Sequence, residues 1–235
     1  MDLKKRKDNR CLVGIQKMDK LLGGGVPHGS SVLVAGVAGT GKTVALLEFL
    51  YRGASEHNSK GLFFSFEESK ERLIAVGKGL GWDVEAQIKR GMLKIIYIPQ
   101  VDIRIEENVA LIHDEIADFG AERVAIDSLS VFLDKIDSPQ LVRDKVSQLT
   151  NIIQAAGAVG FFATSIPYGQ ISLSRYGVEE TVVDGVILLS TFVKGSTRER
   201  YLEVFKLRNS AHILGQHKMK IDKGGIKITP KSSRS

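Results

Sequence analysis

The sequence contains little of what a secreted or membrane protein needs. Its 235 residues include one cysteine, Cys11, so a disulfide within the chain is excluded and a reducing compartment is expected. No apolar run approaches the ~20 residues of a membrane span. Residues 1–10 are charged and no apolar segment follows them, so we expect no secretory signal peptide. Together these absences predict a cytoplasmic protein without a membrane span.

Acidic side chains are outnumbered by basic ones, but the basic excess is confined to the two ends. The formal net charge is +6. Residues 1–10 carry +3 and residues 217–235 carry +5, which leaves 6 − 8 = −2 for the residues between them. Basic ends can bind a polyanion loosely, or they can be solvated tails. Because the rest of the chain is nearly neutral, we favour solvated tails and do not expect nucleic acid as a principal partner.

The chain has only five prolines and neither a repeat nor a low-complexity tract, which favours one regular α/β domain. Apolar strand-like runs alternate with segments of helical periodicity, as in a parallel sheet wrapped by helices. The predicted strands are 31–35, 61–66, 93–98, 123–126, 159–164 and 183–189. The predicted helices are 43–54, 70–80, 105–119 and 139–156. After residue 189 the strand-like segments 200–207 and 226–228 have no helix between them, which predicts an antiparallel C-terminal extension.

Residues 36–43 read Gly-Val-Ala-Gly-Thr-Gly-Lys-Thr, the pattern G-x-x-x-x-G-K-T of a phosphate-binding loop. The segment lies between a predicted strand and a predicted helix, where such a loop belongs. Its glycines let successive backbone N–H groups turn toward a phosphate, and the helix N-terminus adds partial positive charge. Lys42 is expected to reach the β- and γ-phosphates, and the Thr43 hydroxyl to hold Mg²⁺. The predicted nucleotide-binding residues are Gly36, Gly39, Thr40, Gly41, Lys42, Thr43 and Val44.

Acidic residues follow two of the other predicted strands. Asp127 ends the strand at 123–126, at the sheet edge where open α/β sheets bind ligands, and is the predicted second Mg²⁺ residue. Glu67 and Glu68 follow the strand at 61–66, which we expect to lie beside the phosphate-loop strand. Neighbouring residues face opposite ways, so one carboxylate should point into the site and the other away. The alternatives are that Asp127 caps a turn and that the glutamates open the next helix, where negative charge suits the helix dipole.

Five short segments resemble KaiC-type ATPases of the RecA superfamily, in the family's order and at nearly its spacing over about residues 11–229. They are Met-Asp-Lys-Leu-Leu-Gly-Gly-Gly-Val-Pro-His-Gly-Ser at 18–30, Phe-Glu-Glu-Ser at 66–69, Ile-Asp-Ser at 126–128, Arg-Tyr-Gly-Val-Glu-Glu at 175–180 and Lys-Leu-Arg at 206–208. The resemblance implies a RecA-like core, ATP as the nucleotide, and a homo-oligomeric ring, usually a hexamer. It also divides the chain into an ATPase domain at 11–229 with tails at 1–10 and 230–235.

The resemblance also implies roles for individual residues. It assigns Glu67, with Glu68, to activation of the attacking water. It assigns five residues to contacts with the nucleotide of the neighbouring subunit: Lys206, Leu207, Arg208, Ser210 and His212. Of these, Lys206 and Arg208 would stabilise charge on the γ-phosphate. For His212 alone, an ordinary surface histidine is the alternative.

Two departures from the family pattern limit what the resemblance implies. Residues Thr164-Ser165 stand where the family has Thr-Glu, so a sensing role for that glutamate does not carry over. The block at 175–180 resembles the ATPase half of KaiC and lacks the adjacent Ser-Thr pair that the other half phosphorylates. The hydroxyls of Ser172, Ser174 and Thr181 lie nearby in the sequence, but autophosphorylation is not expected. Circadian timekeeping does not follow from the fold.

Three functions compete on this basis. The leading hypothesis is a Mg²⁺-dependent ATPase ring that switches its conformation or its binding to an unidentified regulatory protein. The second is an ATP sensor that assembles on a partner and hydrolyses ATP negligibly. The third is a DNA-associated recombinase paralogue, which the nearly neutral body and the absence of aromatic residues interleaved with cations disfavour.

Overall fold

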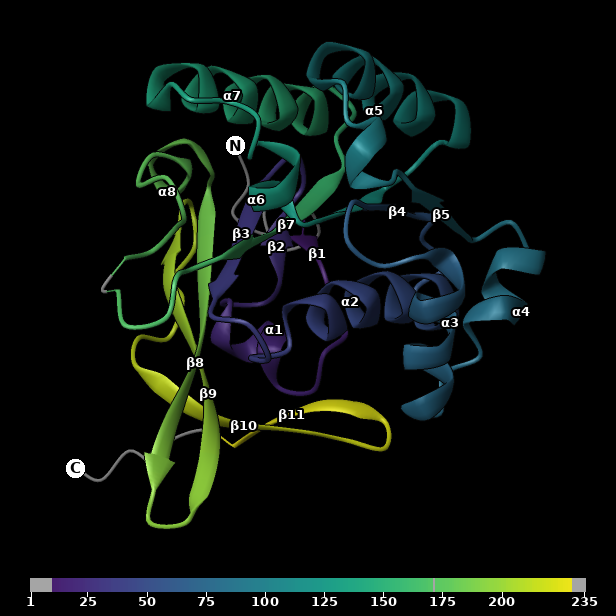
Figure 1. The fold of residues 1–235 in the computed structure, drawn as a ribbon. Helices are drawn as coiled ribbons and strands as arrows, with labels where there is room; N and C mark the ends of the chain where they lie inside the picture. Colours follow the sequence, from purple (N-terminus) through teal and green to yellow (C-terminus); the bar gives the residue numbers. More distant parts are fainter. Residues whose placement is uncertain (1–9, 171, 230–235) are drawn as a thin grey trace, which may run out of the picture.

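The computed structural model describes residues 10–170 and 172–229, and its centre is a nine-stranded sheet between two layers of helices (Figure 1). The predicted tails, apart from Arg10, lie outside the described residues. The parallel strands are β3 (Ser31–Gly36), β4 (Gly61–Ser65), β5 (Leu93–Tyr97), β6 (Arg123–Asp127), β7 (Val159–Ser165) and β8 (Gly185–Lys194). The antiparallel strands are β9 (Thr197–Leu207), β10 (Gln216–Asp222) and β11 (Gly225–Thr229). The predicted fold class is therefore confirmed.

The strand order across the sheet is β11-β10-β9-β8-β3-β7-β6-β4-β5. The prediction that the strand before Glu67 lies beside the phosphate-loop strand is wrong, because β7 and β6 stand between β3 and β4. The helix that joins β3 to β4 is α2 (Lys42–Glu56), and it packs across both β6 and β4. A crossover helix that spans several strands lets β4 lie away from β3, so nearness in sequence does not decide which strands are neighbours here.

Helices cover both faces of the sheet (Figure 1). One face carries α5 (Ile105–Phe119) and α7 (Pro139–Ala155), and the other carries α2, α3 (Lys70–Gly79) and α4 (Val84–Lys89). The alternation along β3 fits both layers. Val32 and Val34 belong to the buried cluster on the α2 side, whereas Leu33 belongs to the cluster on the α5 and α7 side. A sheet buried on both faces explains why its central strands read as continuous apolar runs.

The parallel strands bring their carboxyl ends to one edge of the sheet. Gly36, at the end of β3, pairs with Ser165 of β7 and with Leu189 of β8. On the other side of β7, Ser65 at the end of β4 pairs with Asp127 at the end of β6. The three loops that carry the predicted site residues therefore leave the sheet at the same edge, where open α/β sheets bind ligands.

Several short elements were not predicted. They are α1 (Met18–Leu21), α4, α6 (Leu129–Phe132), α8 (Glu179–Val182), the 3₁₀ turn Gln100–Asp102, and the small β1 (Arg10–Cys11) and β2 (Val26–Pro27) pair. None is long enough to show a clear apolar period in the sequence. No helix in the part of the chain that the structure describes is long and apolar enough to cross a membrane.

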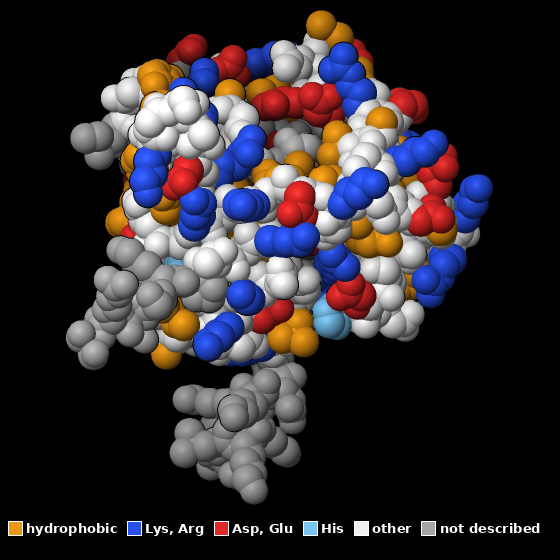
Figure 2. Space-filling view, turned by 90° about the horizontal axis from the view of Figure 1, so that it is seen from below, with side chains coloured by type: hydrophobic (Ala, Val, Ile, Leu, Met, Phe, Trp, Pro, Cys, Tyr) orange, Lys and Arg blue, Asp and Glu red, His pale blue; other side chains and the backbone are white. Residues whose placement is uncertain are grey.

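The C-terminal strands extend the sheet and then turn under α2 (Figure 1). The expected strands 200–207 and 226–228 lie within β9 and β11, but β10 between them was not predicted. Figure 2 views this lower side and shows lysines and arginines scattered over it with acidic side chains between them. The described residues on this face form no continuous basic stripe of the kind that follows a nucleic-acid backbone.

Candidate functional site

The predicted phosphate-binding loop connects the end of β3 directly to α2. Gly39 and Gly41 have φ angles of +81° and +105°, which glycine adopts without strain. At Gly36 a side chain would collide with the carbonyl oxygen of Leu189 on β8. Within the loop, the Thr40 hydroxyl donates to the Val37 carbonyl at 2.8 Å. Glycine at 39 and 41 therefore lets the loop turn, and glycine at 36 lets its backbone pass close to β8.

Lys42 begins α2, and its side chain folds back over the loop. Its Nζ donates to the carbonyl oxygen of Gly36 at 2.8 Å and to that of Val37 at 3.2 Å. The residue is 8% exposed. Burial lowers the pKa of its ammonium, while the Asp127 and Glu67 carboxylates raise it. The Lys42 ammonium therefore lies inside the loop, which is the position from which it can contact a bound phosphate.

Asp127 is buried at the end of β6, within reach of the first turn of α2. Burial raises the pKa of its carboxyl group to about 6, while the hydrogen bond from the Thr43 hydroxyl lowers it and the charge of Glu67 raises it further. Its Oδ2 is buried and has no hydrogen-bond partner among the described residues. The structure therefore brings the two predicted Mg²⁺ residues together and leaves one carboxylate oxygen available to a ligand.

The two glutamates after β4 face different ways, as the sequence predicts. Ser128, which follows Asp127, donates through Oγ to Glu67 Oε1 at 2.6 Å. Glu67 is exposed, and its charge acts on both Lys42 and Asp127. This carboxylate therefore stands at the mouth of the loop.

Glu68 turns instead toward α3. Arg72 donates to its Oε2 at 3.2 Å on a surface where both side chains are well exposed. Glu68 nevertheless lines a shallow depression together with Thr43 and Val44 at the start of α2. The structure thus places Glu67 nearer the predicted chemistry and Glu68 at its margin.

Lys206 and Arg208 lie far from the phosphate-binding loop of their own chain. The register pairs Leu207 with Gly185 at the start of β8, whereas the loop begins where Gly36 pairs with Leu189. The two cations therefore stand beside the amino end of β3, whereas the loop leaves the carboxyl end of that strand. Leu207, between them, points the other way and is buried in the core.

Within the subunit both cations bind the last turn of α8. Lys206 Nζ donates to the carbonyl oxygens of Glu180 at 2.9 Å and Val183 at 2.7 Å. Arg208 donates to Thr181 O at 3.1 Å and Val182 O at 3.4 Å, and a carboxylate oxygen of Asp184 lies 3.6 Å away. Cations suit the free carbonyls and negative dipole of a helix C-terminus.

Ser210 and His212 lie in the loop after β9. Ser210 Oγ donates to Leu22 O at 2.5 Å, and the backbone N–H of Ile213 donates to Leu21 O at 2.8 Å. This loop is thereby fixed to the glycine-rich segment at 22–25. Both ring nitrogens of His212 are buried without a hydrogen-bond partner among the described residues.

Arg200 contacts the phosphate-binding loop and was not among the predicted site residues. It lies on β9, and its Nε and one Nη donate weakly to Gly39 O at 3.4 and 3.3 Å. The sequence predicts a strand there, but the contact depends on how β9 pairs with β8 and twists over the loop. No local pattern in the sequence could have revealed this second cation.

Of the hydroxyls considered for phosphorylation, that of Ser174 contacts Glu179, which is fully buried in α8. Ser174 Oγ donates to Glu179 Oε2 at 2.6 Å, and the backbone N–H of Tyr176 donates to the same oxygen at 3.1 Å. Thr181 Oγ1 donates to the Val178 carbonyl at 2.6 Å. Two of the three hydroxyls therefore have internal partners in the folded subunit, whereas Ser172 Oγ is buried without one among the described residues.

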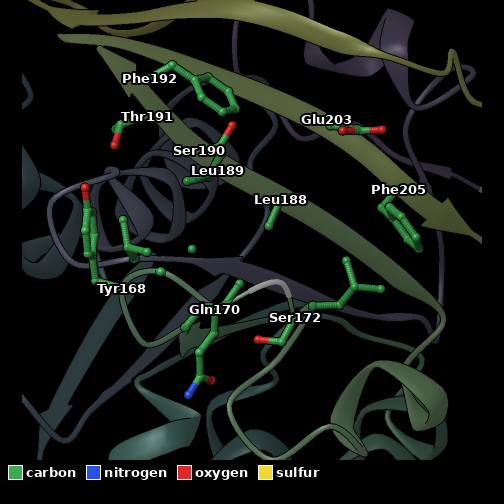
Figure 3. A pocket seen from close by; sticks show the side chains of 15 residues that line it. Tyr168, Gln170, Ser172, Leu188, Leu189, Ser190, Thr191, Phe192, Glu203 and Phe205 are labelled. Atoms are coloured by element: carbon green, nitrogen blue, oxygen red, sulfur yellow. The ribbon is translucent and has the colours of Figure 1, made fainter.

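An apolar cavity of about 710 Å³ opens beside the phosphate-binding loop, between β8, β9 and the segment after β7 (Figure 3). Its rim carries aromatic side chains that are unusually exposed for their type: Tyr168 at 81%, Phe192 at 49% and Phe205 at 48%. Phe205 is adjacent in sequence to Lys206. An exposed apolar surface of this kind is typical of a contact with another protein chain.

Comparisons with known proteins agree with this geometry. The family model described as "ATPase: KaiC" matches residues 11–233. The circadian clock oscillator proteins KaiC of Parathermosynechococcus lividus and Synechococcus elongatus are each 34% identical to the chain, over 227 and 226 residues. These alignments cover 92% of this chain but 42% and 43% of the relatives, so the chain spans less than half of their length.

The fold has a close counterpart among solved structures. A KaiC-like protein from the hyperthermophilic archaeon Pyrococcus horikoshii OT3 has a TM-score of 0.85 and 31% identity, with 94% of this chain and 99% of that chain covered. The resemblance seen in five short segments of the sequence therefore extends over the whole described domain. Nucleotide binding is the property that this family membership implies. The chain belongs to the KaiC family of RecA-fold ATPases and comprises one ATPase domain of that family.

Proposed function

We propose that the protein binds ATP with Mg²⁺ at residues 36–44 and hydrolyses it while assembled in a ring of identical subunits. The observation that carries this proposal is an arrangement in two parts. Lys42, Asp127 and Glu67 converge at the carboxyl edge of the sheet. Lys206 and Arg208 stand beside the amino end of β3, away from the loop at its carboxyl end, so they would reach an ATP molecule only on a neighbouring subunit.

The donors present fit Mg²⁺, which prefers oxygen ligands. The unpartnered, buried Oδ2 of Asp127 and the adjacent Thr43 hydroxyl would hold the ion together with phosphate oxygens. When bound, Mg²⁺ neutralises phosphate charge and stabilises the charge that develops during phosphoryl transfer. One carboxylate and one hydroxyl suffice, because Mg²⁺ at nucleotide sites takes most of its ligands from phosphate and water.

Residues of the same subunit would bind the phosphates and activate the attacking water. Lys42 would move from the loop carbonyls to the β- and γ-phosphates, whose charge outweighs that of the two carbonyl oxygens. Glu67 would accept a proton from the attacking water, and its hydrogen bond from Ser128 fixes the direction of the carboxylate. Arg200 adds a cation from the same subunit beside Gly39.

The neighbouring subunit would complete the site. In this arrangement Lys206 and Arg208 exchange the carbonyls of α8 for the γ-phosphate across the interface, where they stabilise negative charge in the transition state. The apolar rim formed by Tyr168, Phe192 and Phe205 supports the interface, because assembly would remove this surface from water. We propose a homo-oligomer, hexameric by family analogy, that acts as a conformational switch toward a regulatory protein.

The test is the mass of the protein in solution. Light scattering without nucleotide, with Mg-ATP and with Mg²⁺ and a non-hydrolysable analogue is combined with a phosphate-release assay of the ATP sample. We expect a larger particle with either nucleotide and phosphate release with ATP alone. A protein that stays monomeric in every sample and still releases phosphate from ATP would refute the ring. Assembly without phosphate release would instead favour the ATP sensor, and turnover that requires DNA would favour the recombinase paralogue.

A further inference from the structure

The β10–β11 hairpin lies along α2 and reaches the phosphate-binding loop at one end (Figure 1). At Gly41 an added side chain would meet Ile221 Cδ1 at 2.5 Å and Met219 Cε at 3.9 Å. Both residues belong to β10, and β10 pairs with β9 so that Met219 stands opposite Arg200. The hairpin therefore forms the outer wall of the loop at Gly41, the residue immediately before α2.

The turn of the same hairpin is attached to α2 through a buried carboxylate. Glu48 is 1% exposed, and the backbone N–H of Ile226 donates to its Oε2 at 2.7 Å. The carboxylate fills the space that a side chain at position 225 would occupy, so only glycine fits there. Arg52 donates to Gly224 O at 2.6 Å, and its Nε lies 3.5 Å from Glu48 Oε1.

Glu48 has no part in the proposed phosphate chemistry, and apolar packing of α2 would not need an acid. A buried carboxylate is costly unless it is hydrogen-bonded or neutral. Here burial raises the pKa of Glu48 to about 7, while the Ile226 N–H and Arg52 lower it and Glu56 raises it. The acid is thus retained at a position where, among the described residues, the hydrogen bond that it makes outside α2 is to the hairpin turn.

We propose that Glu48 is a positioning residue for nucleotide binding, which latches the β10–β11 hairpin to α2 so that Ile221 and Met219 hold Gly41 in its binding conformation. The proposal rests on the proposed binding of ATP at residues 36–44. Coupling is reciprocal, so bound nucleotide tightens the attachment of the hairpin as much as attachment tightens nucleotide binding.

The attachment of the hairpin through Glu48 depends on pH. With the hairpin detached, Glu48 is solvated and its pKa returns toward the ordinary 4.5, whereas attachment raises the pKa to about 7. Attachment therefore takes up a proton, is strongest below pH 4.5 and weakens as pH rises through 7. The charged and titratable groups around Glu48 are Arg52 and Glu56 on α2, His57 at its end beside Gly14, and Lys227 of β11, which is paired with Asp222.

Two neighbouring glycines provide a matched pair of variants. Gly224 and Gly225 have φ angles of +94° and +108°, so alanine strains the turn at either position. An added methyl group meets nothing at Gly224 but displaces the Glu48 carboxylate at Gly225. Titration calorimetry of the full chain with Mg²⁺ and a non-hydrolysable ATP analogue should show about tenfold weaker binding for Gly225→Ala than for Gly224→Ala. Equal affinities in two folded variants would overturn the proposal.

Glu48→Gln supplies a second readout that does not depend on the turn. The amide oxygen still accepts the Ile226 N–H but does not titrate. Between pH 6 and pH 8 the wild type should lose several-fold more affinity for the analogue than Glu48→Gln does. The titrations of the nucleotide and of Asp127 are common to both proteins, so the difference reports on Glu48. Identical pH profiles would refute the latch. A wild type that binds no nucleotide would instead refute the proposed function, so the two failures are distinguishable.

Discussion

Replacing Arg208 by alanine should separate its structural role from its proposed role across the interface. In the subunit the guanidinium makes two carbonyl contacts at 3.1 and 3.4 Å and lies 3.6 Å from Asp184, and its side chain is 49% exposed. Contacts of this length on a solvated side chain are worth about 1 kcal/mol in all. The free energy of unfolding of Arg208→Ala should therefore fall only slightly.

The effect on turnover should be far larger. An arginine that stabilises the transition state of phosphoryl transfer contributes about 10³-fold or more to kcat, which corresponds to about 4 kcal/mol. We expect Arg208→Ala to keep its affinity for Mg-ATP within a few-fold while phosphate release falls by about that factor. The assays are urea unfolding for stability, calorimetry for affinity and phosphate release for turnover.

Arg143→Ala is the matched control, because Arg143 also contacts α8, through the Thr181 hydroxyl at 3.0 Å, and is exposed. Loss of the Arg143 contact with α8 in this variant should leave turnover nearly unchanged. If both variants lose turnover equally, the loss reflects the mobility of α8 and the role across the interface is refuted. If Arg208→Ala retains full turnover, Arg208 is surface charge.

Three further predictions test the rest of the site. Lys42→Ala should abolish calorimetric binding of Mg-ATP, because no other ammonium lies inside the loop among the described residues, and undiminished binding would contradict the assignment. Glu67→Gln should bind Mg-ATP normally and release phosphate about 10²-fold or more slowly, as expected for loss of a general base; equal turnover would exclude Glu67 from that role. Phe205→Asp should prevent the nucleotide-dependent increase in mass measured by light scattering, since it places a charge on the apolar rim. Val101 is exposed and does not line that cavity, so the control variant Val101→Asp should assemble normally.

The local parts of the site could be predicted from the sequence because each has its own short-range signal. The glycines of the phosphate-binding loop sit between a β-branched run and a helical period, and Asp127 follows an apolar run whose end had to lie at the sheet edge. The opposite directions of Glu67 and Glu68 follow from the geometry of extended backbone. The roles of these residues in ATP hydrolysis remain predictions.

What the sequence did not reveal depends on long-range contacts. The position of β4 away from β3 follows from the packing of α2 across β6, which no single segment encodes. β10 was missed because its buried Met219 alternates with lysines and because its pairing with β9 and β11 is not encoded in its own segment. Arg200 contacts Gly39 of the phosphate-binding loop and Glu48 contacts Ile226 of β11. Both partners lie far away in the sequence, and only the folded chain brings them together.

In the proposed ring, the separation of the two cations from the loop of their own chain would give each subunit two different sides, one that donates cations and one that accepts them. A subunit with a defective loop would then still donate Arg208 to its neighbour, and a subunit without Arg208 would still accept the arginine of another subunit. Mixing Lys42→Ala with Arg208→Ala, each inactive alone, should then restore activity wherever an intact loop meets an intact arginine. Head-to-tail contacts of this kind leave no unused side only when the ring closes, so an open assembly would always contain one loop without a donor.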